Sequence, residues 1–480
     1  MKKNNYTLLI PVENQVRELD AKLLLACVAA KRGFTSIIGP RREMHFQIPR
    51  FPQSIYLSKG VSTGSTSVFK MLRRFGHQIA AWDEEALVHL PQELYFRRRL
   101  SPVAIQCVTD LFAWGEDNAE LWRQYHDMPA ETTVHITGNP RGDLLRPDVR
   151  SYYEPDVKQL QQIYGDFILI NTNFAAVNAY YSDLNLITKK SVSAITPTMG
   201  KRAQRWGVSP EYAQAFSSHK QAIFEDFQRL IPAIEKEFPQ HSIVVRPHPV
   251  ENPQVYHKIA AGCQRVRVTN EGNVVPWLMA AKALLHNGCT TGVEAYVLNQ
   301  PAITYRASAN EDYDQKFHHL PNLLSHQCFS FEELRQTLAK ILAGQIGAAD
   351  GDERKALMDY YLEAQEGPLA CERMVDVLEA MSTNRSGGQT VTLKQRLQGR
   401  FWAIKRRMRK RLRGIGAGSS QIHSEFLRHR YPSISADEIR DRITRFQRVL
   451  AAEIQVSVEP TCRLFFKIRP DSNGLQGKFR

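Results

Sequence analysis

Short apolar runs that end in polar residues alternate with amphipathic segments through most of the chain. In the first part these runs are residues 6–12, 35–38, 54–57, 78–82, 103–108, 111–114 and 133–136; in the second they are 167–171, 242–246, 265–268, 283–286 and 302–305. Helical patterns lie between them, for example at 18–32 and 220–238. This alternation is typical of βαβ units, so we predict an α/β fold with two doubly wound, Rossmann-like domains.

Domain boundaries are suggested by length and by changes in composition. A chain of 480 residues is too long for one ordinary core. A polar stretch near 146–156 separates a first domain at 1–150 from a second at 151–381. Residues 382–390 are rich in Ser, Gly, Asn and Gln and predict a linker. Residues 382–480 then form a C-terminal extension with a basic helix, a second helix opened by a capping box at Ser435 and Glu438, and a terminal hairpin.

Two strand ends in the second part carry the most informative chemistry. Residues 242–246 lead into Arg246-Pro-His-Pro249, and residues 283–286 lead into a turn that opens a helix. Ligands of parallel sheets bind beyond the carboxyl ends of the strands, and a helix start favours phosphate. We therefore predict a phosphate-binding site that includes, besides Arg246 and His248, the following residues of the turn and helix: Asn287, Gly288, Thr290, Thr291 and Glu294. A salt-bridged strand end with a solvated histidine is the alternative, and Cys289 is expected to pack rather than react.

Two further segments are candidates for the same site. Asn171 and Asn173 follow the strand predicted at 167–171 and should face the same edge, unless they form only a capping turn. Gly138-Asn-Pro-Arg141 lies near the predicted domain boundary, where Arg141 would reach the ligand or simply belong to a turn.

Several segments taken together resemble the bacterial surface carbohydrate biosynthesis protein family. They are residues 11–26, Asp83-Glu-Glu85, Gly138-Asn-Pro-Arg141, Arg246-Pro-His-Pro249 and 286–295. The Arg-Pro-His-Pro element is also similar to elements of capsular Kdo transferases and of teichoic-acid polymerases that use CDP-glycerol or CDP-ribitol. The resemblance implies a GT-B-type pair of domains, a cytidine-linked donor such as a CMP-ulosonic acid, a glycan acceptor and no separate cofactor or metal. A CDP-polyol phosphotransferase and a non-catalytic scaffold for polysaccharide assembly are the alternatives.

A glycosyl transferase also needs a group that activates the acceptor hydroxyl, or a carboxylate nucleophile. His248 is placed to protonate a leaving phosphate. Glu13 follows the first predicted strand, and Asp83, Glu84 and Glu85 follow the strand at 78–82. One of these four carboxylates is expected to act; an exposed acidic helix start is the alternative for the last three, and the sequence does not choose among them.

The basic charge of the chain is concentrated in one segment. The net charge is +14, and residues 380–424 hold eleven Lys or Arg and no acid. Within 393–415, apolar residues recur at intervals of three or four and draw one stripe on a helix. This pattern predicts binding to an anionic membrane through Phe401, Trp402, Arg406, Arg407, Arg409 and Lys410. A helix docked on its own protein and a nucleic-acid contact are the alternatives, the last disfavoured because no nucleic-acid motif accompanies it.

The remaining features point to the cytoplasm. No stretch approaches the roughly 18 apolar residues of a membrane-spanning helix, and the N-terminal apolar run is too short for a signal peptide. Seven scattered cysteines suit a reducing compartment. We expect a cytoplasmic protein that lies peripherally on the inner face of the membrane, near a lipid-linked acceptor.

Overall fold

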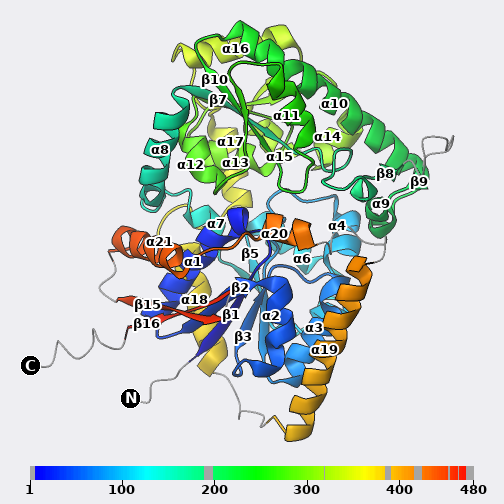
Figure 1. Cartoon of the computed structure of the whole chain (residues 1–480), viewed down its shortest axis with the longest axis vertical. Coiled ribbons are helices and arrows are strands. Elements are labelled where there is room, and N and C mark those ends of the chain that lie inside the picture. Colours follow the sequence, from blue (N-terminus) through cyan, green and yellow to red (C-terminus); the bar gives the residue numbers. More distant parts are fainter. Residues whose placement is uncertain are drawn as a thin grey trace, which may run out of the picture. The chain divides into compact units, whose positions relative to one another are not determined.

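The computed structural model describes residues 6–188, 198–317, 319–383, 391–415, 424–451, 455–462 and 464–471. The chain divides into two compact units, and each has its own sheet (Figure 1). Unit 1 comprises Met1–Leu87, Arg98–Tyr152 and Leu357–Arg480; unit 2 comprises Val88–Arg97 and Tyr153–Ala356. The chain therefore leaves unit 1 briefly at residues 88–97, leaves it again near residue 152 and returns to it near residue 357.

The sheet of unit 1 has the strand order β15-β16-β2-β1-β3-β4-β5-β6. Its six parallel strands are β1 (Thr7–Val12), β2 (Thr35–Pro40), β3 (Ile55–Ser58), β4 (Gln78–Ala81), β5 (Asp110–Ala113) and β6 (Thr133–Ile136). The chain passes from β1 to β2 on one side and then returns to β3 on the other. The carboxyl end of β1 is therefore the topological switch point, the usual ligand position in a doubly wound sheet.

An antiparallel hairpin extends this sheet from the far end of the sequence. It consists of β15 (Val456–Cys462) and β16 (Phe465–Pro470), and β16 pairs with β2. Gly39 of β2 allows this close approach, because a Cβ atom there would lie 2.3 Å from a ring carbon of Phe465. The hairpin expected from the sequence is confirmed, and it covers the edge of the parallel sheet.

Helices cover both faces of the unit 1 sheet, as the amphipathic segments predicted. The buried helix α1 packs against α7, α18 and α21 as well as against the sheet. The helices of unit 1 are α1 (Gln15–Lys31), α2 (Arg41–Gln47), α3 (Thr66–Arg74), α5 (Pro102–Ile105), α6 (Glu116–Arg123), α7 (Pro140–Asp143), α18 (Ala370–Thr383), α19 (Leu393–Ile415), α20 (Ser424–Arg430) and α21 (Ala436–Val449), with short 3-10 turns η1 (Ile48–Arg50), η2 (Thr63–Ser65) and η3 (Arg150–Tyr153). Helix α4 (Gln92–Arg99) belongs mostly to unit 2.

The sheet of unit 2 is entirely parallel, in the order β11-β10-β7-β12-β13-β14. Its strands are β7 (Phe167–Thr172), β10 (Ser242–Pro247), β11 (Val266–Val268), β12 (Ala283–His286), β13 (Ala302–Tyr305) and β14 (His326–Cys328); β8 (Ile187–Thr188) and β9 (Thr198–Met199) form a separate small pair. From β7 the chain moves to β10 and β11, then returns to β12 on the other side of β7. The switch point of this sheet therefore lies at the carboxyl end of β7.

One apolar core fills the face of this sheet that α10, α11 and α16 cover. The helices of this part are α8 (Glu154–Tyr164), α9 (Lys201–Trp206), α10 (Pro210–Glu237), α11 (Gln254–Ala261), α12 (Val274–Ala280), α13 (Thr290–Val297), α14 (Glu311–Phe317), α15 (His319–Leu323), α16 (Phe331–Leu342) and α17 (Asp352–Tyr361), with the 3-10 turn η4 (Ser182–Leu184).

The predicted α/β fold class is confirmed, because each of the two units contains a doubly wound, Rossmann-like parallel sheet. Three details differ from the expectation. Helix α10 begins at Pro210, because Ser209 caps it by accepting a hydrogen bond from the backbone N–H of Tyr212 at 3.1 Å. The apolar run at 103–108 is largely the short helix α5, capped by Ser101. The division of the chain also differs from boundaries at 150 and 381, because α18 and the C-terminal hairpin pack on unit 1. Most of the predicted linker at 382–390 lies outside the described residues.

Candidate functional site

Three polar side chains form a row at the switch point of the unit 2 sheet. The register pairs Asn171 of β7 with Arg246 of β10 on one side and with His286 of β12 on the other. All three are at least nine-tenths buried. Because paired residues of neighbouring strands project to the same face, these side chains lie on the face opposite to the α10 core.

Hydrogen bonds between Asn287 and the backbone of Asn173 connect the carboxyl ends of β12 and β7. The side chain of Asn287 accepts a hydrogen bond from the backbone N–H of Asn173 at 2.9 Å and donates to its carbonyl at 3.4 Å. By contrast, neither amide atom of the buried Asn171 side chain has a hydrogen-bond partner among the described residues. A buried amide without partners is costly, so this position calls for a water or a ligand.

Arg246 is held differently from the sequence expectation. Its two terminal nitrogens donate to the carbonyls of Glu271 and Gly272 at 2.8 and 3.1 Å, and its guanidinium lies 4.5 Å from the ring centre of Trp277. Burial lowers the pKa of Arg246 to about 9. In this conformation Arg246 fixes the loop before α12, a positioning role that the strand-end argument did not foresee.

His248 lies in a turn that a buried carboxylate organises. The backbone N–H of His248 donates to Glu251 at 3.1 Å, and Tyr256 and Thr172 donate to the same carboxylate. Nδ1 of His248 accepts from the backbone N–H of Val250 at 3.3 Å, so the proton of the neutral ring sits on Nε2. Burial raises the pKa of Glu251. The sequence analysis missed this residue, although it stands only three positions beyond His248.

The turn before α13 is supported by the buried imidazole of His286. Nδ1 accepts from the backbone N–H of Gly288 at 3.0 Å, while Nε2 lies 2.9 Å from the hydroxyl of Ser325, which itself donates to the carbonyl of Pro321. These partners require a neutral ring with the proton on Nε2. Burial lowers the pKa of His286 to about 3. Gly292 is needed here, because a Cβ atom would lie 2.6 Å from Nε2.

Helix α13 begins at Thr290, directly after the turn that the sequence predicted to open a helix. The N-cap residue Cys289 makes no side-chain cap, and its thiol instead contacts the hydroxyl of Thr291 at 2.7 Å. Thr290 and Thr291 are partly exposed, whereas Glu294 is buried inside the helix. Burial raises the pKa of Cys289 to about 11, in keeping with a packing role.

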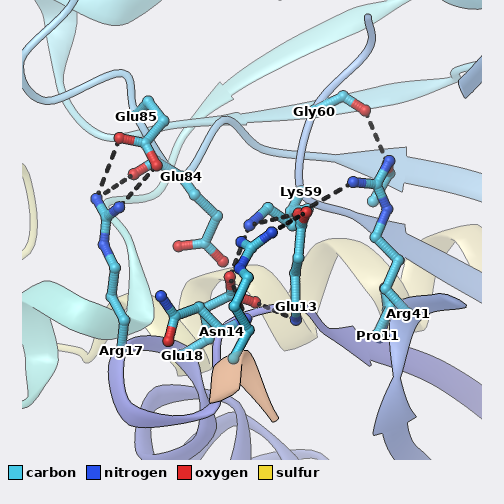
Figure 2. A network of polar contacts seen from close by, with 12 residues as sticks. Pro11, Glu13, Asn14, Arg17, Glu18, Arg41, Lys59, Gly60, Glu84 and Glu85 are labelled. Atoms are coloured by element: carbon cyan, nitrogen blue, oxygen red, sulfur yellow. Dashed lines mark hydrogen bonds and ion pairs between the residues drawn. The ribbon is translucent and has the colours of Figure 1, made fainter. Parts of the chain in front are cut away.

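A cluster of charges surrounds the switch point of the unit 1 sheet (Figure 2). At its centre Glu18 accepts from the backbone N–H groups of Glu13 and Asn14 at 2.9 and 3.1 Å, which caps the start of α1. Glu18 also binds Lys22 and Lys59, each at 2.6 Å. Burial raises the pKa of Glu18, but the two lysines more than offset that effect and hold it far below its ordinary value.

All four carboxylates considered as catalytic lie in or beside this cluster, and each has a cationic partner. Glu13 meets Arg41, Lys59 and Arg430; Glu84 meets Lys22 at 3.3 Å; Glu85 meets Arg17 at 2.7 Å; and Asp83 pairs with Arg99. Their exposure distinguishes them. Asp83 and Glu84 are buried, whereas the side chains of Glu13 and Glu85 reach solvent.

Arg141 belongs to this same cluster of unit 1. Its guanidinium lies 5.6 Å from the ring centre of Trp114 and 3.4 Å from the carbonyl of Glu84, and Asn139 caps its helix. The sequence left open whether Arg141 reaches a ligand of the second domain. Here it is buried beside Glu84 in unit 1.

Four cations that contact Glu13, Glu18 or Glu84 were not predicted from the sequence. Arg41 and Lys59 directly follow β2 and β3, so the strand-end rule used for Arg246 would have found them. Lys22 lies one turn beyond Glu18 on α1 and could have been paired with it by spacing. Arg430 gave no signal, because it is 417 positions away from Glu13 in the sequence.

Helix α19 docks on unit 1 by one face and exposes the other. Gly399 and Ala403 are buried, and a Cβ atom on Gly399 would lie 2.2 Å from the ring of Phe75. The predicted apolar stripe lies on the opposite face: Leu393, Leu397, Phe401, Ile404 and Met408 are 57–75% exposed. Trp402 and Arg406 are partly buried near the docking face, and Arg406 donates to Ser67 at 2.8 Å.

The described part of the chain has neither a cluster of metal ligands nor a helix suited to span a membrane. No group of three His, Cys, Asp or Glu side chains in the described part of the chain is arranged to hold a metal ion. Among the described helices, none combines the length and the apolar character needed to cross a bilayer.

Comparison with known proteins gives similarity in structure alone. No family model matches the chain, and no curated protein sequence does either. Among solved structures, the chain is similar to the UDP-GlcNAc 2-epimerase of Methanocaldococcus jannaschii, with 12% identity and a TM-score of 0.46 over 78% of this chain and 99% of that one. The corresponding epimerase of Neisseria meningitidis gives 14% identity and a TM-score of 0.45 over 79% and 100%. The wall teichoic acid polymerase TagF gives 10% identity and a TM-score of 0.43 over 81% and 91%.

Proposed function

We propose that the protein is a nucleotide-dependent glycosyltransferase of surface polysaccharide biosynthesis. The donor would be a sugar linked to a cytidine nucleotide, an ulosonic acid such as Kdo on CMP, and the acceptor a growing glycan. The observation that carries this proposal is the polar row at the switch point of unit 2, where doubly wound sheets bind their ligands.

Several features of that switch point support a nucleotide phosphate as the ligand. The start of α13 offers backbone N–H groups and the positive end of a helix dipole, with Thr290 and Thr291 beside it. The unpartnered amide of Asn171 supplies both a donor and an acceptor. Because Nδ1 of His248 accepts from Val250, the ring carries its proton on Nε2, which is the donor that a leaving phosphate would need. Arg246 would act on this site through the loop that it holds.

The transfer would join the acceptor oxygen to the anomeric carbon as the bond from that carbon to the nucleotide phosphate breaks. The hydroxyl proton would pass to a carboxylate base, and the nucleotide would leave as CMP. Among the four carboxylates, Glu13 is favoured as this base, because it is partly exposed while Asp83 and Glu84 are buried. Glu85 is also exposed and stays a second candidate.

Calorimetric titration with CMP, CDP, UDP and GDP tests the proposal. We expect a cytidine nucleotide to bind best and His248→Gln to weaken binding. His257→Gln is the matched control, because His257 is an exposed histidine of the neighbouring helix α11 and should change nothing. If none of the four nucleotides binds, the enzyme proposal fails and the scaffold alternative gains.

A CDP-polyol phosphotransferase would use the same features of unit 2. Product analysis separates the two enzymes, because both release CMP but only the phosphotransferase leaves a phosphate in the polymer. A donor screen with CMP-Kdo, CDP-glycerol and CDP-ribitol therefore decides between them.

We further propose that the protein works at an anionic membrane on the cytoplasmic side, held there by α19. The exposed stripe of α19 supplies apolar surface, and Ile404 and Met408 continue into a groove lined by Phe46 and Pro49. Exposed arginines flank the stripe at Arg400, Arg407 and Arg409. An apolar stripe with basic flanks is the pattern of helices that lie in a lipid interface.

Vesicle flotation tests the membrane proposal. The protein should float with vesicles of phosphatidylglycerol and not with phosphatidylcholine alone, and Phe401→Asp should abolish flotation. Ile163→Asp is the control, because Ile163 of α8 is a similarly exposed aliphatic residue outside the stripe. Flotation that survives Phe401→Asp would remove α19 as the anchor.

A further inference from the structure

Three cations converge on the carboxylate of Glu13 at the switch point of unit 1. Glu13 follows β1, Arg41 follows β2 and Lys59 follows β3, which are adjacent strands. Nη1 of Arg41 and Nζ of Lys59 lie 3.1 and 3.0 Å from Oε2 of Glu13. Nη1 of Arg430, from helix α20 of the C-terminal extension, lies 3.0 Å from Oε1. We call these three cations the cradle.

The cluster around the cradle holds more positive than negative charge. The buried part pairs Glu18 and Glu84 with Lys22, and Lys59 is shared between Glu18 and Glu13. The carboxylates of this group are Glu13, Glu18 and Glu84, and its cations are Lys22, Lys59, Arg41 and Arg430. Four cations therefore face three carboxylates, which leaves the group with a net charge of one positive unit. Arg406 is close enough to Arg41 for their charges to repel.

The cradle is open to solvent, unlike the pairs beneath it. The side chains of Glu13, Arg41 and Arg430 are 30%, 25% and 20% exposed, whereas that of Glu18 is 1% exposed. Figure 2 shows Glu13, Lys59 and Arg41 pointing toward one another. The Nε atoms of Arg41 and Arg430 are themselves buried and have no hydrogen-bond partner within the described part of the chain, so an anion would meet the terminal nitrogens of both groups.

We propose that Arg41, Lys59 and Arg430 form a binding site for an anionic group, a carboxylate or a phosphate, and that Glu13 occupies this site until the ligand displaces it. Guanidinium forks suit both kinds of anion, and the switch point of a doubly wound sheet is the usual ligand position. The assignment of this anion to the glycan acceptor rests on the proposed function; the anion site itself does not.

Displacement would also change the chemistry of Glu13. Burial raises the pKa of Glu13, but Lys59, Arg430 and Arg41 together hold it well below its ordinary value, which makes Glu13 a poor base. An anion that takes these cations raises the pKa of Glu13 toward its usual range. The acidic group of the ligand would then prepare Glu13 to accept a proton.

Calorimetric titration of the full chain with inorganic phosphate and with glucuronate tests the site, with glucose as the neutral control. We expect saturable binding of at least one anion, and the two titrations distinguish a phosphate site from a carboxylate site. Arg430→Gln should weaken binding about tenfold, the loss expected for one charge-assisted contact. Glu13→Gln should tighten binding, because it removes the internal competitor. Arg428→Gln, on the exposed side of the same helix, should have no effect.

Arg430→Gln and Glu13→Gln should change the affinity for the anion in opposite directions, the first weakening it and the second strengthening it. Phosphate held at α13 of unit 2 would be insensitive to both Arg430→Gln and Glu13→Gln, so that result overturns the cradle. Absence of binding by both anions, or a Glu13→Gln variant that binds no more tightly, also overturns it. If Arg430→Gln does not unfold cooperatively, Arg430→Lys replaces it and should bind more weakly than the wild type. Loss of CMP binding with intact anion binding would contradict the proposed function and leave the cradle standing.

Discussion

The side chain of Asn287 accepts a hydrogen bond from the backbone N–H of Asn173 at 2.9 Å and so joins the carboxyl ends of β12 and β7. Asn287→Leu removes this acceptor, and we expect it to lower the free energy of unfolding by about 1–2 kcal/mol. Asn287→Asp keeps an acceptor, so its stability should stay close to that of the wild type. It places a negative charge beside the proposed phosphate, however, and should reduce CMP binding strongly. Urea unfolding and calorimetry measure the two effects separately; a stable Asn287→Asp variant with unchanged CMP affinity would contradict the site.

The unpartnered amide of Asn171 gives a second prediction in which stability and binding change in opposite directions. Asn171→Leu replaces a buried amide by an apolar side chain of similar size, so the free energy of unfolding should be unchanged or higher. If the amide serves a nucleotide, the same variant should bind CMP more weakly. A variant that is destabilised and binds CMP normally would show that Asn171 serves the fold alone.

His286 should make the stability of the protein depend on pH. Its pKa is about 3 in the folded chain against 6.5 for an ordinary histidine. Between these values the unfolded chain binds a proton that the folded chain does not, so stability is lost as pH falls below about 6.5. The loss is about 1.4 kcal/mol for each pH unit, and about that much between pH 7.5 and 5.5. Urea unfolding at these two pH values should show this difference in the wild type and a smaller one in His286→Asn.

The buried pairs of unit 1 predict a large cost for losing one lysine. Nζ of Lys22 binds Glu18 at 2.6 Å, Glu84 at 3.3 Å and the carbonyl of Pro11 at 2.7 Å. Lys22→Met leaves two buried carboxylates without this cation and should cost about 3–5 kcal/mol. Adding Glu84→Gln to Lys22→Met should cost less than the sum of the two single changes, because the two residues interact. Lys70→Met, at an exposed lysine of α3, is the control.

Gly399 gives a prediction opposite to the usual effect of replacing a helical glycine. In an exposed helix, Gly→Ala stabilises by up to about 1 kcal/mol. Here the added Cβ atom would lie 2.2 Å from the ring of Phe75, so Gly399→Ala should loosen α19 from unit 1. Faster trypsin cleavage within α19 would report this change. Leu397→Ala, on the exposed face of the same helix, should leave the cleavage rate unchanged.

The helices and strands could be predicted from the local pattern of apolar and polar residues. The strands at 133–136, 283–286 and 302–305 and the helix at 393–415 have the predicted bounds, because apolar runs and periodic stripes end at clear polar boundaries. Ser435 also caps α21 as the capping box predicted, by accepting from the backbone N–H of Glu438 at 3.0 Å. The strand-end rule placed Asn171 and Arg246 at one edge of one sheet, whereas His286, which pairs with Asn171 there, was not among the predicted site residues.

Which charged side chains pair, and which face of a helix packs on the protein, depended on the tertiary structure. Periodicity along a helix fixes which residues share a face, so the apolar stripe of α19 follows from the sequence alone. Only the fold decided that the opposite face docks, because Gly399 and Ala403 are small enough to approach Phe75 and α2 closely. Likewise the sequence placed Glu13 at a strand end, but its partner Arg430 comes from 417 positions away. Charged side chains are paired by the fold that brings them within a few ångströms, and such distances are not encoded in local spacing.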